Sequence, residues 1–398
     1  MSELPLEGII ILDFATLLAG PVSTTILGDF GATIIKIELP KVGDSTRGMG
    51  IFPSGRGPSW LVEGRNKKAI TLDLHTKEGQ ELAHKLAAKA DAVVMNFRPG
   101  RAEGWHIGSE DLHRTNPELI IAQVSAYGQT GPYHKKGGFD RTASAFGGIT
   151  YVTGFPDQPP VRSGYALVDY MTAYLGAFGL VMALYNRKVN GTGGEVIDIS
   201  LVESGFRASE SALVDYSLSG RIRERTGNRN PFVVPADDFE TKDGRILVIN
   251  AGVDTLWTKL AYAIGHPELL EDPRFNSRFA RIGNQDQLYE IVADWVKDLT
   301  ADEALEILDQ AEVPADIIRN IEDLAHDPHL RARDAVLEVE DPEQGKVLVP
   351  GVFPKLTKHP GRIKFLGAKL GEHNQEIYSE FLGLSADEIT ELEKKGVI

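Results

Sequence analysis

The sequence predicts an α/β protein whose first 130 residues form a parallel, doubly wound sheet. Short apolar segments alternate with helical patterns over this stretch, and strands separated by helices run parallel. The chain has 398 residues, more than one hydrophobic core usually holds, so a second domain is expected. Its charged fraction of 25% and hydrophobic fraction of 42% are those of a globular protein.

The first two predicted strands, residues 8–14 and 32–38, enclose a helix with clear boundary residues. Pro21 suits the first turn of that helix, since proline lacks a backbone N–H, and Gly31 suits its C-terminal cap. The alternation then continues with strands over 68–74, 92–97 and 119–125 and an amphipathic helix over 76–90.

Composition changes twice further along the chain. Residues 221–235 are polar and rich in Pro and Asn, which is typical of a linker. After Asp327 and Pro328 the pattern returns to strands and loops. We therefore expect residues 225–330 to form a small α+β domain inserted in a large domain of residues 1–224 and 331–398. The small domain is predicted to contain a strand over 245–250 and helices near 255–264 and across 285–311. Strands over 346–350 and 362–365 and a helix over 385–395 are predicted after it.

The chain carries 42 basic and 57 acidic residues, a formal net charge of −15. This charge argues against nucleic acid or an anionic membrane as a partner. No uninterrupted apolar run reaches membrane-spanning length, and the N-terminus lacks the basic start of a signal sequence. A cytoplasmic protein is expected.

The sequence lacks the motifs of several common kinds of catalytic and binding site. Without cysteine, disulfides, thiolate nucleophiles and thiolate metal sites are excluded. The glycine-rich dinucleotide and P-loop motifs, His-Glu-x-x-His and Gly-x-Ser-x-Gly do not occur, and no metal site is expected. A catalyst of this composition most readily uses a carboxylate or a lysine as its covalent group.

Asp169 is the most informative candidate, because it is the lone carboxylate in the stretch 159–176 and stands just before an apolar run over 170–185. A carboxylate beside a core element costs several kcal/mol to bury unless it is paired. Two interpretations fit: Asp169 caps the N-terminus of the helix over 170–185, or it is a nucleophile.

Short motifs follow one another along nearly the whole chain, with the carboxylate Asp169 among them. They are Leu12-Asp13-Phe14, Ala19-Gly20-Pro21, residues 31–38, Gly43-Asp44, Arg47, Arg65-Asn66-Lys67-Lys68, Leu72-Asp73-Leu74, residues 96–100, residues 128–132, Phe139-Asp140, Gly147-Gly148, Arg187, residues 191–194, residues 196–200, Gly227-Asn228-Arg229 and residues 370–373. In this order the set resembles one family, the class III CoA-transferases.

The resemblance implies that Asp169 is a nucleophile that forms an acyl anhydride and then a CoA thioester, with Asp140 as a nearby acid. It implies a Rossmann-like large domain built from both chain ends, a small domain from the middle, and an interlocked homodimer. The implied substrates are an acyl-CoA and a carboxylic acid, with no permanently bound cofactor. A helix N-terminus at Asp169 would favour the ionised carboxylate, so capping and catalysis are compatible.

By the same resemblance, the CoA contacts fall on Leu18, Leu72, Asn96, Phe97 and Arg98. A plain strand-to-helix turn would also explain residues 96–100, since Pro99 and Gly100 produce one. A nucleotide with several phosphate charges needs local cations on a chain of charge −15, and the available cluster is Arg98, Arg101, Lys135 and Lys136.

For the substrates, succinyl-CoA is the expected donor. A free carboxylate end would need a cation, and Arg47, Arg162 and Arg229 are candidates, although a structural ion pair would equally explain Arg162. Phe232 makes part of the expected acceptor site apolar. Leu18 and Leu39 replace a Gln and an Arg of the formyl-CoA enzymes, and residues 228–235 replace their glycine-rich loop, which argues against formyl–oxalate exchange.

Two alternatives remain. Acyl-CoA racemases of the same superfamily use a His where this chain reads Gly138-Phe139-Asp140, so the base they need is missing. The chain could also be one subunit of a heteromeric CoA-transferase, which retention of Asp169 disfavours.

Overall fold

A computed structural model describes residues 4–50 and 56–398. The chain forms two compact units, each described here by itself. The first comprises residues 1–149, 163–213 and 328–398, and the second comprises residues 150–162 and 214–327. Residues 150–162 belong to the second unit although they come just before the helix that carries Asp169, an assignment that no sequence pattern indicated.

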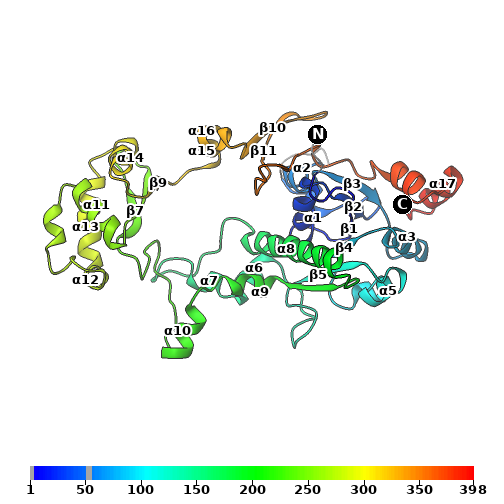
Figure 1. The fold of residues 1–398 in the computed structure, drawn as a ribbon, viewed down its shortest axis with the longest axis horizontal. Helices are drawn as coiled ribbons and strands as arrows, with labels where there is room; N and C mark the ends of the chain where they lie inside the picture. The colour runs from blue at the N-terminus through cyan, green and yellow to red at the C-terminus, as the bar shows by residue number, and fades with distance from the viewer. Residues whose placement is uncertain (1–3, 51–55) are drawn as a thin grey trace. The chain divides into compact units, whose positions relative to one another are not determined.

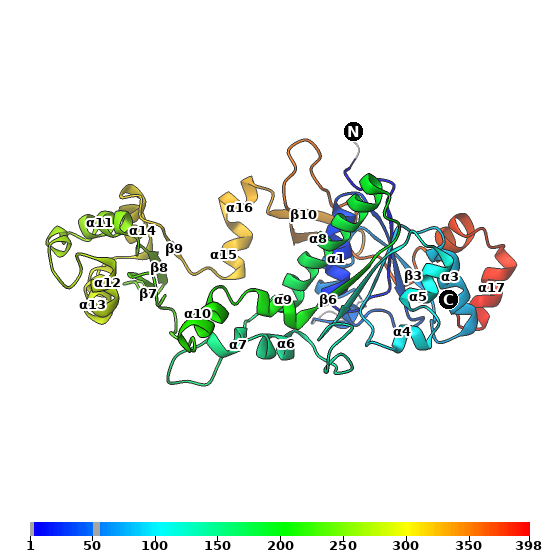
Figure 2. The same ribbon diagram turned by 60° about the horizontal axis from the view of Figure 1, so that its bottom comes forward.

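Six parallel strands form the sheet of the first unit, in the order β3-β2-β1-β4-β5-β6 (Figures 1 and 2). This order is that of a nucleotide-binding α/β sheet, in which the chain changes direction between the first and fourth strands. All four residues of β4 and all six of β5 are buried, as expected for parallel strands covered on both faces. The strands are β1 (Ile10–Asp13), β2 (Thr33–Glu38), β3 (Lys67–Thr71), β4 (Ala92–Met95), β5 (Ile120–Ser125) and β6 (Val196–Ser200).

Two hydrophobic cores lie on opposite faces of this sheet, because alternate strand residues point to opposite sides. Ile11 packs with Leu27 and Leu180 in the core under α1 (Ala19–Asp29) and α8 (Leu167–Asn190). Leu12 packs with Leu86 in the other core. Figure 2 shows the helices of the second face, which are α3 (Lys77–Ala87), α5 (Ser109–Thr115) and α17 (Ala386–Lys394).

The C-terminal segment completes the second of these cores. Tyr378, in a π-helical turn over Glu376–Phe381, donates a hydrogen bond from its hydroxyl to Thr71 O at 2.6 Å. Asp73 N donates to Val397 O at 2.7 Å. The chain end therefore packs directly against the sheet.

The remaining elements of or next to the first unit are α2 (Pro58–Glu63), α4 (Arg101–Gly104), α6 (Asp140–Phe146), α7 (Ile149–Val152), α9 (Leu201–Arg207), α10 (Ala212–Ser219), α16 (Pro328–Ala332), the 3₁₀ turn Ser45–Gly48 and the hairpin β10 (Val336–Asp341) and β11 (Gly345–Pro350).

The second unit has its own antiparallel sheet in the order β7-β8-β9. Its core includes Phe239, Trp257, Phe275 and Leu288, all nearly inaccessible to solvent. The elements are β7 (Ala236–Glu240), β8 (Ile246–Asn250), α11 (Asp254–Ala263), the 3₁₀ turn Pro267–Leu270, α12 (Arg278–Gly283), α13 (Gln285–Val296), α14 (Ala301–Gln310), β9 (Ala315–Ile317) and α15 (Ile321–His326).

The strand predicted over 362–365 is wrong. Its backbone groups bond to side chains and loops instead of a neighbouring strand: Asn66 Nδ2 donates to Arg362 O at 2.9 Å, and Lys364 N donates to Asn66 Oδ1 at 2.7 Å. Arg362 N donates to Asp29 O at 2.9 Å. Asn66 and Asp29 thus supply the backbone hydrogen bonds that a neighbouring strand would otherwise provide.

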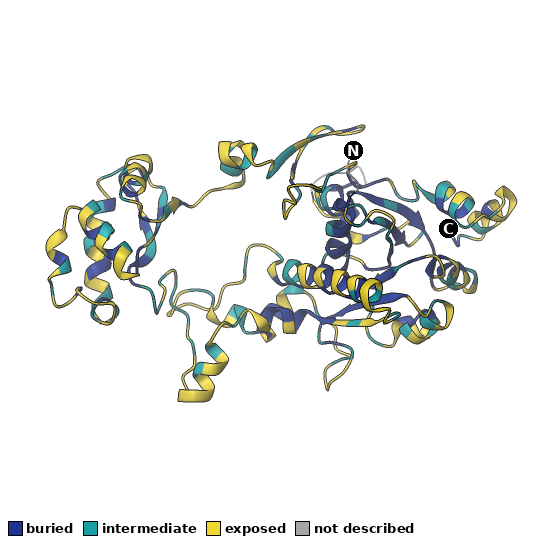
Figure 3. Ribbon diagram, viewed as in Figure 1, coloured by how far each residue is buried: buried dark blue, intermediate teal, exposed yellow. Residues whose placement is uncertain are grey.

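The helix expected over 170–185 is longer, and α8 has 24 residues with a mean hydropathy of 1.6 in its most apolar window. Although glycine and polar residues interrupt its apolar sequence, α8 is one helix among the described residues that could cross a membrane by length and composition alone. Half of that window is buried within the unit, against α1 and the sheet, which is how a core helix is placed. Figure 3 shows its remaining face exposed.

Substituting Leu86→Ala on α3 should lower the free energy of unfolding of the protein by about 2–5 kcal/mol, because it removes a fully buried side chain and leaves a cavity. The matched control is Lys85→Ala on the exposed side of the same helix, which should change stability by less than about 0.5 kcal/mol. Urea denaturation of both variants measures the difference, and equal midpoints would contradict this packing.

Candidate active site

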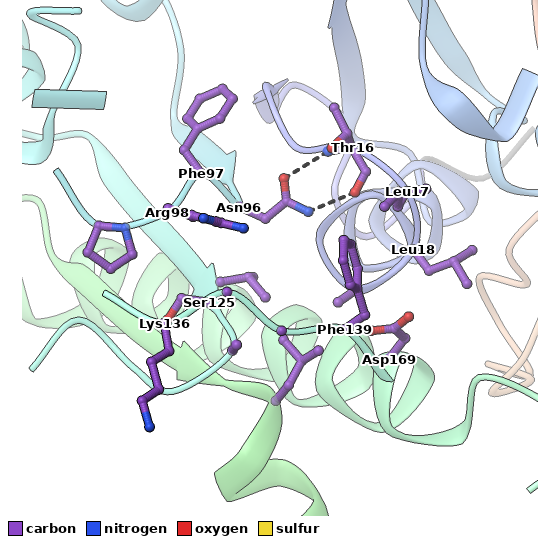
Figure 4. A pocket seen from close by; sticks show the side chains of 17 residues that line it. Thr16, Leu17, Leu18, Asn96, Phe97, Arg98, Ser125, Lys136, Phe139 and Asp169 are labelled. Carbon is purple, nitrogen blue, oxygen red and sulfur yellow. Dashed lines mark hydrogen bonds between the residues drawn. The ribbon is translucent and has the colours of Figure 1, made fainter. Parts of the chain in front are cut away.

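A pocket of about 200 Å³ opens at the carboxyl ends of β1, β4 and β5, where parallel α/β sheets place their ligands. The loops after these three strands form its walls, and the first turn of α8 brings Asp169 to its edge (Figure 4). Six residues expected from the sequence line it: Leu18, Asn96, Phe97, Arg98, Lys136 and Asp169.

The carboxylate of Asp169 does not cap its helix. The helix begins three residues earlier than the apolar run suggested, with Ala166 at the N-cap position and no side-chain cap there. Asp140 performs this role from α6: its Oδ1 accepts hydrogen bonds from Val168 N at 2.8 Å and Asp169 N at 3.3 Å. The side chain of Asp169 is therefore left without a hydrogen-bond partner or an ion pair in the described structure.

Partial burial, together with the nearby charge of Asp140, raises the pKa of Asp169 to about 7. Burial is the larger cause, because it penalises the charged carboxylate. A carboxyl group poised near neutral pH inside a pocket is typical of a reactive group rather than of a structural one. The arrangement leaves one half-buried carboxylate whose oxygens are available to a ligand.

Cationic side chains line the opposite wall. Arg98 stands at the end of β4 above Gly137, where any side chain would come within 2.4 Å of its Nη2. Lys136 lines the same wall with its Nζ 3.8 Å from the centre of the Tyr133 ring. Both side chains are exposed, so they can meet an anionic ligand at the rim.

Asn96 lines the pocket with its amide already bonded to the protein. Its side chain accepts from Thr16 N at 2.9 Å and donates to Thr16 O at 2.7 Å, so both ends of its amide are occupied by the β1–α1 loop (Figure 4). Leu18 follows in that loop at the N-cap position of α1. Asn96 thus holds a wall of the pocket in place.

A second hollow of about 120 Å³ shares Thr16 and Phe97 with the first. Leu72 lies here, with Leu39 on the neighbouring strand end and Trp105 opposite. The Trp105 ring also packs edge-on against Phe97, with 5.1 Å between ring centres. This hollow offers flat apolar and aromatic surfaces within the first unit.

Other expected residues lie outside these two hollows. Arg101 and Lys135 are exposed, and Arg101 lies 5.4 Å from the Trp105 ring. Arg47 is buried and bonds Glu38 through two nitrogens at 2.7 Å each. Its third nitrogen donates to Ala368 O at 2.9 Å, so its donors serve the protein itself.

Three expected substrate residues belong to the second unit. Arg229 bonds Asp237 at 3.0 Å and Asp286 at 2.5 Å, so its charge is already paired. Phe232 is half-buried, with Arg221 5.1 Å from its ring centre. Arg162 is exposed and forms no ion pair among the described residues.

Sequence reasoning missed several residues of the pocket. Thr16, Leu17, Ser125, Gly137 and Phe139 all line it. The signal that could have found them is position, since Ser125 is the last residue of a parallel strand and the others lie in the connections that follow such strands. Across residues 4–50 and 56–398, no group of three or more His, Asp or Glu side chains is arranged to hold a metal ion.

The sequence of the chain matches a known family of enzymes. Residues 6–374 match the family described as CoA-transferase family III, and the chain therefore belongs to that family of CoA-transferases. It is 43% identical over 395 residues to succinyl-CoA–D-citramalate CoA-transferase of Chloroflexus aurantiacus, covering 99% of this chain and 98% of that protein.

Two further similarities agree with this membership. The beta subunit of succinyl-CoA–L-malate CoA-transferase of Chloroflexus aurantiacus is 41% identical over 402 residues, covering 100% of this chain and 99% of that one. The crystal structure of a CAIB/BAIF family protein from Brucella suis superposes with a TM-score of 0.84 at 32% identity, covering 95% of this chain and 100% of that one.

The Asp169 carboxyl group should titrate with a midpoint near pH 7, neutral below it and charged above it. In Asp140→Asn the midpoint should fall but stay above the ordinary value of 3.8, because the repulsion disappears while the larger cause, burial, remains. Carbon-13 NMR of labelled aspartate carboxyls, with Asp169→Asn as the assignment control, measures both. A wild-type midpoint near 4 would contradict this account of the site.

Proposed function

We propose that this protein transfers coenzyme A from succinyl-CoA to a dicarboxylic acid, with Asp169 as the covalent nucleophile. The observation that carries the proposal is the unpaired Asp169 carboxylate at the edge of a pocket with a cationic rim. The succinyl-CoA-dependent relatives support the donor, since two proteins at 41% and 43% identity use it by name.

The proposed chemistry has two symmetrical halves. An oxygen of Asp169 attacks the thioester carbonyl of the donor, the carbon–sulfur bond breaks, and CoA leaves as a thiolate with the bonding electrons. The thiolate then attacks the aspartyl carbonyl and releases the donor acid as a carboxylate. The acceptor carboxylate repeats both steps in reverse, which regenerates Asp169. No oxidant and no net proton are needed, and each anhydride keeps the energy of the thioester.

We propose that the two hollows share the CoA molecule. The nucleotide base would lie in the apolar hollow beside Leu72 and Trp105, and its phosphates would lie near Arg98 and Lys136. The thioester end would then reach Asp169 past Thr16 and Phe97, which border both hollows. Arg101 and Lys135 would add local positive charge outside the pocket, which offsets the net charge of −15 for an anionic ligand.

For the free carboxylate of a dicarboxylic substrate we propose Arg162, because Arg47 and Arg229 are already bound to carboxylates. The assembly that we propose is the interlocked homodimer typical of the family, in the cytoplasm. The beta-subunit relative favours one alternative, that this chain works beside a second homologous subunit. Activity of the chain expressed alone would decide between them.

Asp169→Asn should abolish CoA transfer while leaving the fold intact, since the amide cannot attack a thioester and the helix cap belongs to Asp140. Incubation of the wild type with succinyl-CoA followed by borohydride should mark Asp169, as mass spectrometry of its peptide would show. The control is Asp157→Asn, a carboxylate in an exposed turn. Near wild-type turnover in Asp169→Asn would overturn the mechanism, and efficient formyl–oxalate exchange without use of succinyl-CoA would overturn the substrate.

Arg98→Ala should raise KM for the acyl-CoA about tenfold or more and leave kcat nearly unchanged, because phosphate contacts bind ground and transition states alike. Gly137→Ala should act in the same direction without lowering stability, since the new methyl group displaces the guanidinium end of a flexible side chain. Arg114→Ala, at an exposed site on α5, is the control. Steady-state kinetics with the acyl-CoA varied would test this, and an unchanged KM in both variants would remove Arg98 from the site.

A further inference from the structure

Four charged side chains from separate sequence motifs meet beneath the loop between β1 and α1. Lys36 Nζ lies 3.0 Å from Asp44 Oδ2 and 3.6 Å from Asp13 Oδ1. Lys67 Nζ lies 2.9 Å from Asp13 Oδ2 on the other side. None of the four is more than 3% exposed. Neither Asp13 nor either lysine lines the pocket, so none of these three residues has a role in the chemistry proposed above.

These charges bond the backbone of the loop. Lys36 Nζ donates to Ala15 O, and Asp13 Oδ1 accepts from Ala15 N at 3.1 Å. Asp44 Oδ1 accepts from Leu17 N at 3.3 Å. The Asn96 amide bonds both backbone groups of Thr16, the intervening residue. Side chains from four separate segments therefore hold three consecutive loop residues.

The same loop contains a backbone outlier. Leu17 has a φ of 66°, in the left-handed region that costs a non-glycine residue about 1–2 kcal/mol. Such a conformation persists only where the surroundings impose it, and it concentrates at functional sites. Leu17 lines the pocket that contains Asp169. The strained residue Leu17 is thus bonded to one of the buried charges and lies where the substrate would bind.

Stability alone does not account for this cluster. Replacing buried ion pairs by apolar side chains of similar volume is often neutral or stabilising, whereas removing one partner costs about 3–5 kcal/mol. What apolar residues cannot supply is a directed donor for Ala15 O and a directed acceptor for Leu17 N. The bonds that Asp13, Lys36 and Asp44 make to the loop are therefore the distinctive product of this cluster, in which Lys67 holds Asp13.

We propose that Asp13, Lys36, Asp44 and Lys67 are positioning residues that fix the β1–α1 loop as the wall against which the acyl group meets Asp169. The loop then sets both the angle of attack on the thioester and the room for the acyl chain beside Leu17 and Leu18. This inference rests on the proposed function and extends it to Asp13, Lys36 and Lys67, which line neither hollow, and to Asp44, which borders the second one.

The experiment separates positioning from stability. Lys36→Met leaves Asp44 without its buried partner, so this variant should unfold at a lower temperature than the wild type. Lys36→Met with Asp44→Asn restores the balance of charge and should recover most of that loss. Because the donor to Ala15 O is still missing, kcat with succinyl-CoA should remain about 10–100-fold below wild type, the effect of a small misplacement in an active site.

Amide hydrogen exchange of a peptide covering residues 15–19 supplies a readout independent of activity. It should be at least about tenfold faster in the double variant, as the bonds to the loop are lost. Asp341→Asn is the matched control, since it breaks the buried Arg56–Asp341 pair (2.7 Å) of the same unit without touching the loop. That control should lose stability with kcat and loop exchange unchanged.

A double variant with wild-type kcat and wild-type loop exchange would overturn the proposal, and so would an equal loss of kcat in Asp341→Asn. If the lysine variants do not fold, Asp44→Asn alone serves, with the same direction expected for kcat and exchange. A wild type that transfers no CoA from any acyl-CoA would instead sink the proposed function, while the exchange measurement would still test the loop.

Discussion

The carboxylate of Asp13, buried between two lysines, is the constraint on which the arrangement of the first unit depends. It joins β1 to β2 through Lys36 and to β3 through Lys67, and Thr24 Oγ1 adds a bond from α1 at 2.7 Å. Burial would raise the pKa of Asp13, yet the two lysine charges and this hydrogen bond bring it below its ordinary value. Three strands and a helix are thus fixed around one buried carboxylate next to the loop that lines the pocket.

The order of the strands then decides where chemistry can occur. Because β1 and β4 are neighbours while their connections leave in opposite directions, the loops after them separate and open a crevice. Asp140 caps α8, so the side chain of Asp169 is not needed to cap this helix. A carboxylate that is half-buried, unpaired and close to another acid is costly to ionise, which is why the pKa of Asp169 is raised to about 7.

Much of the fold could be predicted from local patterns. The strands over 32–38 and 119–125 and the helix over 385–395 match β2, β5 and α17 within one residue at each end, since apolar periodicity and caps are encoded by near neighbours. The expected arginine Arg47 shows the limit: its guanidinium bonds a carbonyl 321 residues away, and no local pattern contains that partner.

The sequence by itself determined the class of sheet and the family, because strand periodicity and ordered motifs are properties of the chain, and it singled out Asp169 as a candidate. Only the tertiary structure decided that Asp140, 28 residues away from its partner Val168, caps α8 and that Asn96 holds Thr16 rather than facing the pocket freely. It also decided that Asp13, Lys36, Asp44 and Lys67 belong together. The physical reason is that hydrogen bonds and ion pairs form between whichever groups the fold brings within about 3 Å, and separation along the chain does not specify that distance.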